Sequence, residues 1–164
     1  MLKILNILRP FFEDCYRRVG VREYAKIIGV SPPTASKILR EMEKEGLLMA
    51  ENEMGRVLYH AEKSCRDFID LSRIYWRRSL RAVIELLERE SLGGHIILFG
   101  SLSKAEANKD SDVDIAIFGE KKAIDISTFE KRIGRKIHLF WFRSWESLQG
   151  NDLESSIRLG YALR

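Results

Sequence analysis

The sequence predicts a mixed α/β (α+β) protein built from three consecutive blocks of a 164-residue chain. Residues 1 to 62 indicate helices followed by a two-stranded hairpin, and residues 63 to 92 indicate a helical linker. In residues 93 to 164, short apolar runs of strand type alternate with helical segments, which is typical of a small mixed sheet covered by helices. A hydrophobic fraction of 45% with a net charge of +4 is ordinary for a protein that buries a core.

Two helices joined by a short turn account for most of the first block. The apolar pattern of Val21 to Gly29 predicts a short helix that ends at the glycine. Ser31 is a natural N-cap for a second helix reaching about Glu45, because its hydroxyl can accept a hydrogen bond from a backbone N–H at the helix start. The buried face of this second helix is predicted to contain four apolar residues at helical spacing: Ala35, Ile38, Leu39 and Met42.

A hairpin follows the second helix. The stretches Leu47 to Ala50 and Arg56 to His60 flank the polar, glycine-containing turn Glu51 to Gly55. Helix, turn, helix and hairpin form the order of a winged helix-turn-helix domain, whose second helix lies in the major groove of double-stranded DNA. The candidates for DNA contact are the outward residues of that helix and one hairpin residue: Pro33, Thr34, Ser36, Lys37, Arg40 and Arg56.

The distribution of charge favours an anionic partner for the first block. Residues 1 to 40 carry eight Lys or Arg side chains against three acids, an excess that would attract the phosphate backbone of DNA. The glutamates of residues 41 to 53 leave an alternative open, because winged helices also serve as docking surfaces for proteins. The arginine repeat of the linker, Arg73, Arg77 and Arg81, is either a phosphate track or a solvated helix face.

A glycine turn in the C-terminal block is suited to binding phosphate. Phe99-Gly100-Ser101 closes a strand predicted for His95 to Phe99 and opens a helix predicted for Ser101 to Asn108. A glycine at such a turn permits close approach of the backbone, and the helix start offers free N–H groups, the positive end of a dipole and a hydroxyl. These groups together predict a site for a phosphate.

Two carboxylates enter the next predicted strand, Val113 to Phe118. Because residues two apart in a strand point to the same face, Asp112 and Asp114 are expected to project together. Paired oxygen donors of this kind bind Mg²⁺ or Mn²⁺, particularly when substrate phosphates supply further ligands. The remaining elements predicted for this block are a strand at Lys136 to Phe142, a helix at Ser127 to Ile133 and a helix from Asn151 toward the C-terminus.

The stretch Gly100-Ser101, ten intervening residues and Asp112-Val113-Asp114 resembles the minimal nucleotidyltransferases of the DNA polymerase beta superfamily. The resemblance implies transfer of a nucleoside monophosphate from an NTP to an acceptor hydroxyl, with AMP from ATP as the expected group. It implies that Asp112 and Asp114 bind the divalent metal and align the reacting oxygens. The residues expected to bind the nucleotide are Gly100, Ser101, Lys104 and Ser111.

Two positions depart from the family pattern. Ala105 stands where the family often has glycine, a minor difference on the predicted helix. Active members usually carry a third carboxylate on the next strand, and His138 occupies that position here. Histidine can ligate Mn²⁺ or Zn²⁺ or accept a proton, but it brings no negative charge to Mg²⁺, and a strand histidine is often only a packed residue. His138 is therefore a catalytic candidate beside Asp112 and Asp114, and the alternative function is a DNA-binding transcription regulator whose impaired domain senses a nucleotide.

The same features predict partners and location. NTP and double-stranded DNA are the expected ligands, and the family adds a separately encoded, helical toxin-like protein as a candidate acceptor. The amphipathic linker and Phe140-Trp141-Phe142 suit either a homodimer interface or the chain's own core. Cys15 and Cys65 have no Cys-x-x-Cys spacing, and no apolar run approaches the roughly 18 residues that cross a bilayer. A cytoplasmic protein without membrane contact is expected.

Overall fold

The computed structural model describes residues 3–91 and 93–164, which divide into two compact units. The first unit contains the described residues up to Tyr75 together with Ala105–Lys109, and the second contains Trp76–Lys104 and Asp110–Arg164. Helices and a small mixed sheet are both present, as the mixed α/β prediction requires. No helix among the described residues is long and apolar enough to cross a membrane.

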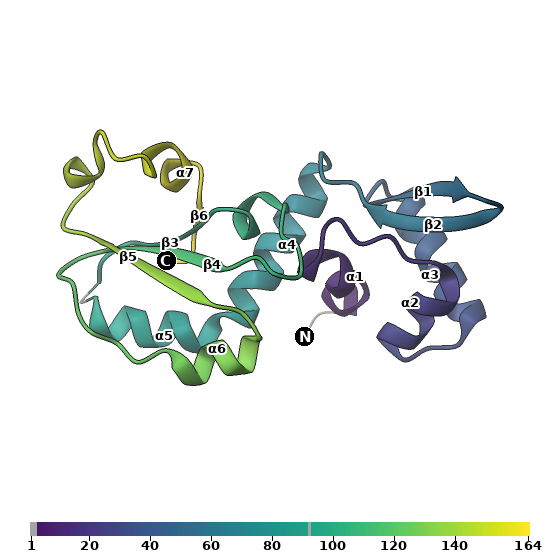
Figure 1. Ribbon diagram of the computed structural model, residues 1–164, viewed down its shortest axis with the longest axis horizontal. Helices are drawn as coiled ribbons and strands as arrows, with labels where there is room; N and C mark the ends of the chain where they lie inside the picture. The colour runs from purple at the N-terminus through teal and green to yellow at the C-terminus, as the bar shows by residue number, and fades with distance from the viewer. Residues whose placement is uncertain (1–2, 92) are drawn as a thin grey trace. The chain divides into compact units, whose positions relative to one another are not determined.

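Three helices, a hairpin and the first part of α4 (Arg66–Ser79) form the first unit (Figure 1). An isolated bridge between Val19 and Tyr59 joins the segment before the second helix to the hairpin. The other elements in chain order are α1 (Lys3–Glu13), α2 (Val21–Ile28), α3 (Pro32–Lys44), β1 (Leu48–Glu53) and β2 (Arg56–Ala61).

The helix boundaries predicted for the turn between α2 and α3 are confirmed. Gly29 ends α2 with φ 71°, a left-handed conformation that glycine adopts without steric cost. Ser31 caps α3: its Oγ accepts the Thr34 N–H at 3.4 Å and lies 2.8 Å from Thr34 Oγ1. Of the four residues predicted for the apolar face of α3, Ala35 and Leu39 are fully buried. Ile38 and Met42 are only half-buried, so the face packs inward in part.

Replacing the α3 cap should destabilise the first unit measurably. Ser31→Ala leaves the Thr34 N–H without its side-chain acceptor, and removal of such a cap costs about 1 kcal/mol. The free energy of unfolding from a urea titration followed by circular dichroism measures this cost. Ser36→Ala, in the middle of the same helix, is the matched control and should be neutral or slightly stabilising, because alanine is the better helix former. Equal effects of the two changes would contradict the cap.

The hairpin turn is shorter than predicted. Glu51 to Glu53, expected in the turn, continue β1, and only Met54 and Gly55 connect the strands, with φ 50° and 76°. Two positive φ values describe a tight turn whose twist matches that of the flanking strands, so the ladder extends to the turn itself. Arg18 adds to this arrangement by pairing with Glu51 at 2.7 Å and Glu53 at 3.5 Å.

A four-stranded sheet with the order β5-β4-β3-β6 forms the centre of the second unit. β4 and β5 are parallel, whereas β3 is antiparallel to both β4 and β6. The sequence does not predict the last strand, since two residues are too few for a periodic signal. The elements after α4 are α5 (Arg81–Glu90), β3 (Ile96–Phe99), the 3₁₀ turn η1 (Leu102–Lys104), β4 (Val113–Phe118), α6 (Ser127–Ile133), β5 (Ile137–Phe142), the 3₁₀ turn η2 (Glu146–Leu148), α7 (Glu154–Arg158) and β6 (Tyr161–Ala162).

Helices cover both faces of this sheet. In Figure 1, α5 and α6 lie on one side of the strands and α7 lies on the other. The α7 side holds a cluster that joins Phe118 and Phe142 to Ile157, with Phe140 packed against it. The aromatic run of β5 thus contributes Phe140 and Phe142 to the chain's own core, one of the two roles considered for it.

The helix predicted for Ser101 to Asn108 is wrong. The chain forms only the three-residue turn η1, and Ala105 then takes φ 55°, which a continuing right-handed helix cannot contain. Ala105 is therefore not the helix residue we expected; it adopts the left-handed conformation that glycine takes more easily. A 3₁₀ turn of three residues has little dipole, so the helix dipole expected at this site is lost. The groups of the turn that can still attract a phosphate are the backbone N–H groups and the Ser101 hydroxyl.

Candidate functional site

The register of the sheet brings four of the predicted residues to one end of the strands: Gly100, Asp112, Asp114 and His138. Phe99, the last residue of β3, pairs with Asp114 of β4, and Asp114 pairs in turn with His138 of β5. Gly100 follows β3 directly, and Asp112 lies just before β4. The glycine turn, both aspartates and the histidine therefore meet at one edge of the second unit.

Asp112 and Asp114 lie within reach of the same imidazole ring. His138 Nδ1 is 3.3 Å from Asp114 Oδ1, and His138 Nε2 is 4.0 Å from Asp112 Oδ2. Because one ring spans both carboxylates, the two aspartates lie on the same side of the sheet. All three side chains remain open to solvent, with exposed fractions of 43% for Asp112, 27% for Asp114 and 51% for His138.

Asp114 is the more buried of the two carboxylates, and its electrostatics reflect that. Burial raises the pKa of the Asp114 carboxyl, and the negative charge of Asp112 acts in the same direction. The hydrogen bond and the positive charge that His138 can carry oppose this rise. A partly desolvated carboxylate beside a second one is a position where a cation is stabilised.

Gly100 touches Asp114 closely. Gly100 has φ 71°, and a Cβ built on it would lie 2.5 Å from Asp114 Oδ2, closer than real side-chain carbons come. Both the backbone conformation and the lack of a side chain are thus required at this position. The turn that could hold a phosphate and the carboxylate that could hold a metal ion are in direct contact.

Two residues that the sequence analysis missed hold the loops of this site. Ser103, fully buried, donates its hydroxyl to the Gly100 carbonyl at 2.9 Å and so fixes the turn. The Arg135 guanidinium donates to the Ser111 carbonyl, directly before Asp112. A serine two or three residues after a turn glycine is a weak sequence signal for the hydrogen bond from Ser103 to Gly100. The second joins residues 24 apart, so no local pattern could reveal it.

The other predicted nucleotide-binding residues flank the turn and the aspartates: Ser101 and Lys104 lie on the turn, and Ser111 directly precedes Asp112. Both Ser101, directly before η1, and Lys104, its last residue, are half-buried, and the Lys104 N–H donates to the Ser101 carbonyl at 3.3 Å. In the described part of the chain, no ion pair joins Lys104 to Asp112 or Asp114. Its ammonium remains available to an anionic ligand.

The chemistry of the aspartate pair fits a divalent cation only in part. Within residues 3–91 and 93–164, no group of three or more His, Cys, Asp or Glu side chains is arranged to hold a metal ion. Two carboxylates on one side of a sheet are nevertheless the protein share of a typical Mg²⁺ site in phosphoryl transfer, where substrate phosphates and water complete the coordination. Asp112 and Asp114 therefore fit a cation that arrives with a triphosphate.

The residues predicted to contact DNA all lie at the surface of the first unit. Pro33, Thr34, Lys37 and Arg40 are exposed on α3, and Ser36 is half-exposed. Arg56 is also exposed, but it lies away from α3, in a surface depression that it lines with Arg22 and the residues at the start of α2. The structure thus groups five of the six residues on one helix and places Arg56 with α2.

The arginine repeat of α4 and α5 is partly neutralised. Arg73 pairs with Asp70 at 3.1 Å, and Arg81 pairs with Glu85 at 2.8 Å, each on its own helix. Arg77 lies over the Tyr161 ring, 6.0 Å from its centroid. Local pairing of this kind favours a solvated helix face over a phosphate track.

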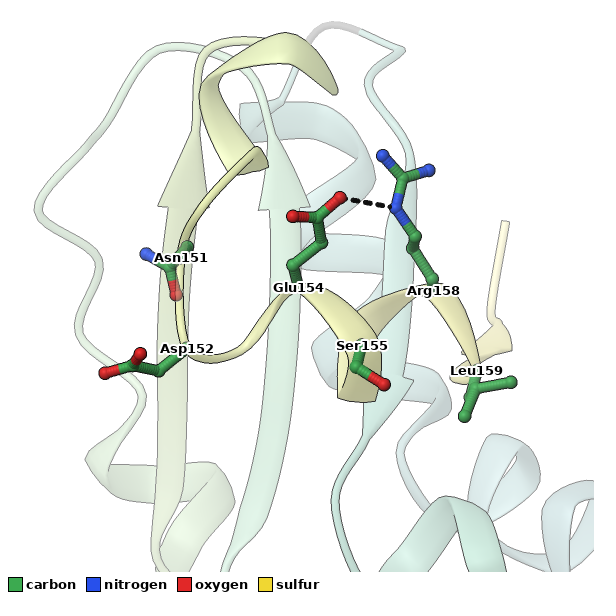
Figure 2. Close-up of a pocket in the computed structure, with 6 residues that line it drawn as sticks. All are labelled: Asn151, Asp152, Glu154, Ser155, Arg158 and Leu159. Atoms are coloured by element: carbon green, nitrogen blue, oxygen red, sulfur yellow. Dashed lines mark hydrogen bonds and ion pairs between the residues drawn. The ribbon is translucent and has the colours of Figure 1, made fainter.

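A surface depression beside α7, shown in Figure 2, lies apart from the predicted residues. Glu154 and Arg158 form an ion pair across it at 2.9 Å, so its positive charge is already paired. The residues that line it are Asn151, Asp152, Glu154, Ser155, Arg158 and Leu159. It offers no phosphate or metal site comparable with the aspartate pair.

Comparison with known families matches the segment of the chain that contains the aspartates. Residues 80–149 match a family model described as a nucleotidyltransferase domain, and this segment contains the glycine turn, both aspartates and His138. Residues 1–79 lie outside the match. Neither the curated proteins nor the solved structures that were compared include a match to this chain. The second unit therefore carries a segment similar to nucleotidyltransferase domains, which supports nucleotidyl transfer as the general class of its activity.

Proposed function

We propose that this protein transfers a nucleoside monophosphate, AMP from ATP, to an acceptor hydroxyl at the site formed by Gly100, Ser101, Asp112 and Asp114. The observation that carries the proposal is the contact of Gly100 with Asp114 Oδ2, with Asp112 on the same side of the sheet. A phosphate held at the turn would lie next to both carboxylates. The family match over residues 80–149 supports the same class of reaction.

Each residue of the site has a part that its chemistry suits. Gly100 and Ser101 would bind the triphosphate through backbone N–H groups and the Ser101 hydroxyl, and Lys104 would neutralise phosphate charge. Asp112 and Asp114 would hold Mg²⁺ or Mn²⁺. When bound, such an ion neutralises charge on the phosphates and aligns the attacking oxygen. Ser103 and Arg135 would act as positioning residues, because their hydrogen bonds to the Gly100 and Ser111 carbonyls fix the two loops of the site.

His138 favours a second candidate function, a regulator that binds a nucleotide without turning it over. The imidazole contacts both aspartates from the position where the family pattern leads us to expect a third carboxylate. Compared with a carboxylate at this position, an imidazole ring brings no negative charge to the site. The affinity of the site for Mg²⁺ is therefore lower. Such a protein would still hold a triphosphate at the Gly100 turn.

Labelled ATP distinguishes the two functions. The protein is incubated with α-labelled ATP and either Mg²⁺ or Mn²⁺, alone and with candidate acceptors, and pyrophosphate release and protein-bound label are followed. Release of pyrophosphate together with label transfer supports the enzyme. Saturable nucleotide binding without release supports the regulator. Absence of binding at millimolar ATP, with either metal, would reject both.

For the first unit we propose a winged helix-turn-helix that binds double-stranded DNA. Support comes from the order of α1, α2, α3 and the β1-β2 hairpin, and from the Val19 bridge that adds a third strand segment to the hairpin. The outward side of α3 exposes Lys37 and Arg40, whereas Ala35 and Leu39 on its apolar side are buried. A helix of this kind can place its first turns in a major groove.

Removing the α3 cations should weaken DNA binding and its dependence on salt. Lys37→Ala with Arg40→Ala is expected to lower affinity about tenfold or more at low salt, and to reduce the slope of log Kd against log salt by about one for each phosphate that the variant no longer neutralises. Fluorescence anisotropy with generic duplex, beginning at about 50 mM salt, measures both quantities. Lys44→Ala, at the far end of the same helix, is the control. If the parent protein binds no duplex at the lowest salt, the DNA-binding proposal is rejected.

A further inference from the structure

The outer edge of β5 has backbone groups without hydrogen-bond partners. In a parallel pair, alternate residues of a strand direct both their N–H and their C=O toward the neighbouring strand. The Lys136 carbonyl accepts from the Val113 N–H, and the Phe142 carbonyl accepts from the Gly119 N–H. The even-numbered residues of β5 therefore face β4. Ile137, Leu139 and Trp141 therefore direct their backbone groups away from β4. Glu130 accepts the Ile137 N–H at 2.9 Å, but no hydrogen bond in the described residues engages Leu139 or Trp141 on that side.

The side chains of this edge are apolar and only partly covered. β5 is the last strand of the sheet, and Leu139, Phe140 and Trp141 are all half-buried. A strand that presents free N–H and C=O groups between partly exposed apolar side chains is a template for pairing with another extended segment. The other edge of the sheet, β6, has only two residues and offers no comparable length.

Unpaired cations stand at both ends of this strand. Lys136 precedes β5 and Arg143 follows it, and both are exposed. Neither side chain has an ion pair or hydrogen bond within residues 3–91 and 93–164. At about 3.3 Å per residue, the two positions are roughly 23 Å apart along the edge. Charge complementarity thus favours a guest that is acidic at both ends and apolar between them.

A second copy of this chain is a less suitable guest, because pairing centred on Leu139 brings like charges together. If two β5 strands paired antiparallel with Leu139 opposite Leu139, Arg143 of each copy would lie opposite Arg135 of the other. The pair of strands would therefore contain two such arginine contacts, one at each end. Like charges directly opposite each other destabilise a strand pair. An acidic partner has no such penalty.

We infer that the β5 edge binds an extended acidic segment of a partner protein, with apolar residues over Leu139 and Trp141 and carboxylates at Lys136 and Arg143. The guest adds a fifth strand to the sheet. This surface does not depend on nucleotidyl transfer, and its test is independent of that activity.

A synthetic peptide probes the edge directly. The full chain, labelled with ¹⁵N, is titrated with a peptide of about nine residues that has Val-Thr-Val-Thr-Val at its centre and two glutamates at each end. Binding should shift the amide signals of Leu139 and Trp141 and slow their hydrogen exchange. A peptide with lysines in place of the glutamates should bind about tenfold more weakly or worse.

Two controls separate strand addition from general attraction. In a bound peptide, only every second backbone N–H donates to β5. Methylation of those backbone nitrogens should abolish binding, whereas methylation of the nitrogens between them should leave the affinity unchanged. Lys136→Glu with Arg143→Glu should reverse the preference, so that the lysine-ended peptide binds better. Equal affinity for both peptides, abolished binding with either methylated set, or no protection at millimolar peptide would overturn the inference. So would protection that grows with protein concentration alone, which identifies a second copy.

Discussion

Replacing Asp114 by asparagine is expected to lower the rate of nucleotidyl transfer by about a thousandfold while the fold is retained. The carboxylate lies against the Gly100 turn and, in the proposed function, would provide with Asp112 the negative charge for a divalent cation. Loss of that charge removes roughly 4 kcal/mol of transition-state stabilisation, a typical contribution of charge neutralisation in such sites. Pyrophosphate release at saturating ATP measures the effect.

Stability gives this prediction its control. Burial raises the pKa of the Asp114 carboxyl, which means that the folded state disfavours its charged form. The neutral asparagine should therefore leave the melting temperature unchanged or slightly raised. Asp152→Asn, an exposed aspartate beside α7 in Figure 2, should alter neither property. Full activity in Asp114→Asn would place the chemistry elsewhere.

Gly100→Ala is expected to lower transfer by about a hundredfold, the second largest effect. The new Cβ would meet Asp114 Oδ2 at 2.5 Å, so the carboxylate must move away from the turn. A displacement of about 1 Å in a catalytic group is enough for a decrease of this size. Nucleotide binding by fluorescence titration and transfer by pyrophosphate release should both be weaker.

Gly150 offers a matched control for the backbone strain in that variant. It has φ 74°, close to the 71° of Gly100, but a Cβ there meets nothing within 4 Å. Each alanine should cost about 1 kcal/mol of stability because both positions are left-handed. Only Gly100→Ala should also impair transfer. Equal activity of the two variants would show that the contact with Asp114 has no functional role.

Much of the fold was predictable because its signals are local. Ser31 and Gly29 mark helix ends through their own hydrogen bonding and backbone freedom, and the structure has both where the sequence placed them. The strands containing Ile115 and Leu139 are evident from their apolar runs. The helix predicted after Ser101 is wrong, because the left-handed conformation of Ala105 has no signal in composition.

The sequence by itself determined which chemical groups this protein has and how they are ordered: a glycine turn, two aspartates at strand spacing and a histidine on a later strand. Periodicity and turn chemistry act between near neighbours, so they are legible without coordinates. Only the tertiary structure decided that Gly100 touches Asp114, that His138 spans both carboxylates, and that Arg135 fixes the loop before Asp112. These contacts join residues far apart in the chain, and sheet register, which depends on the packing of the whole unit, brings them together.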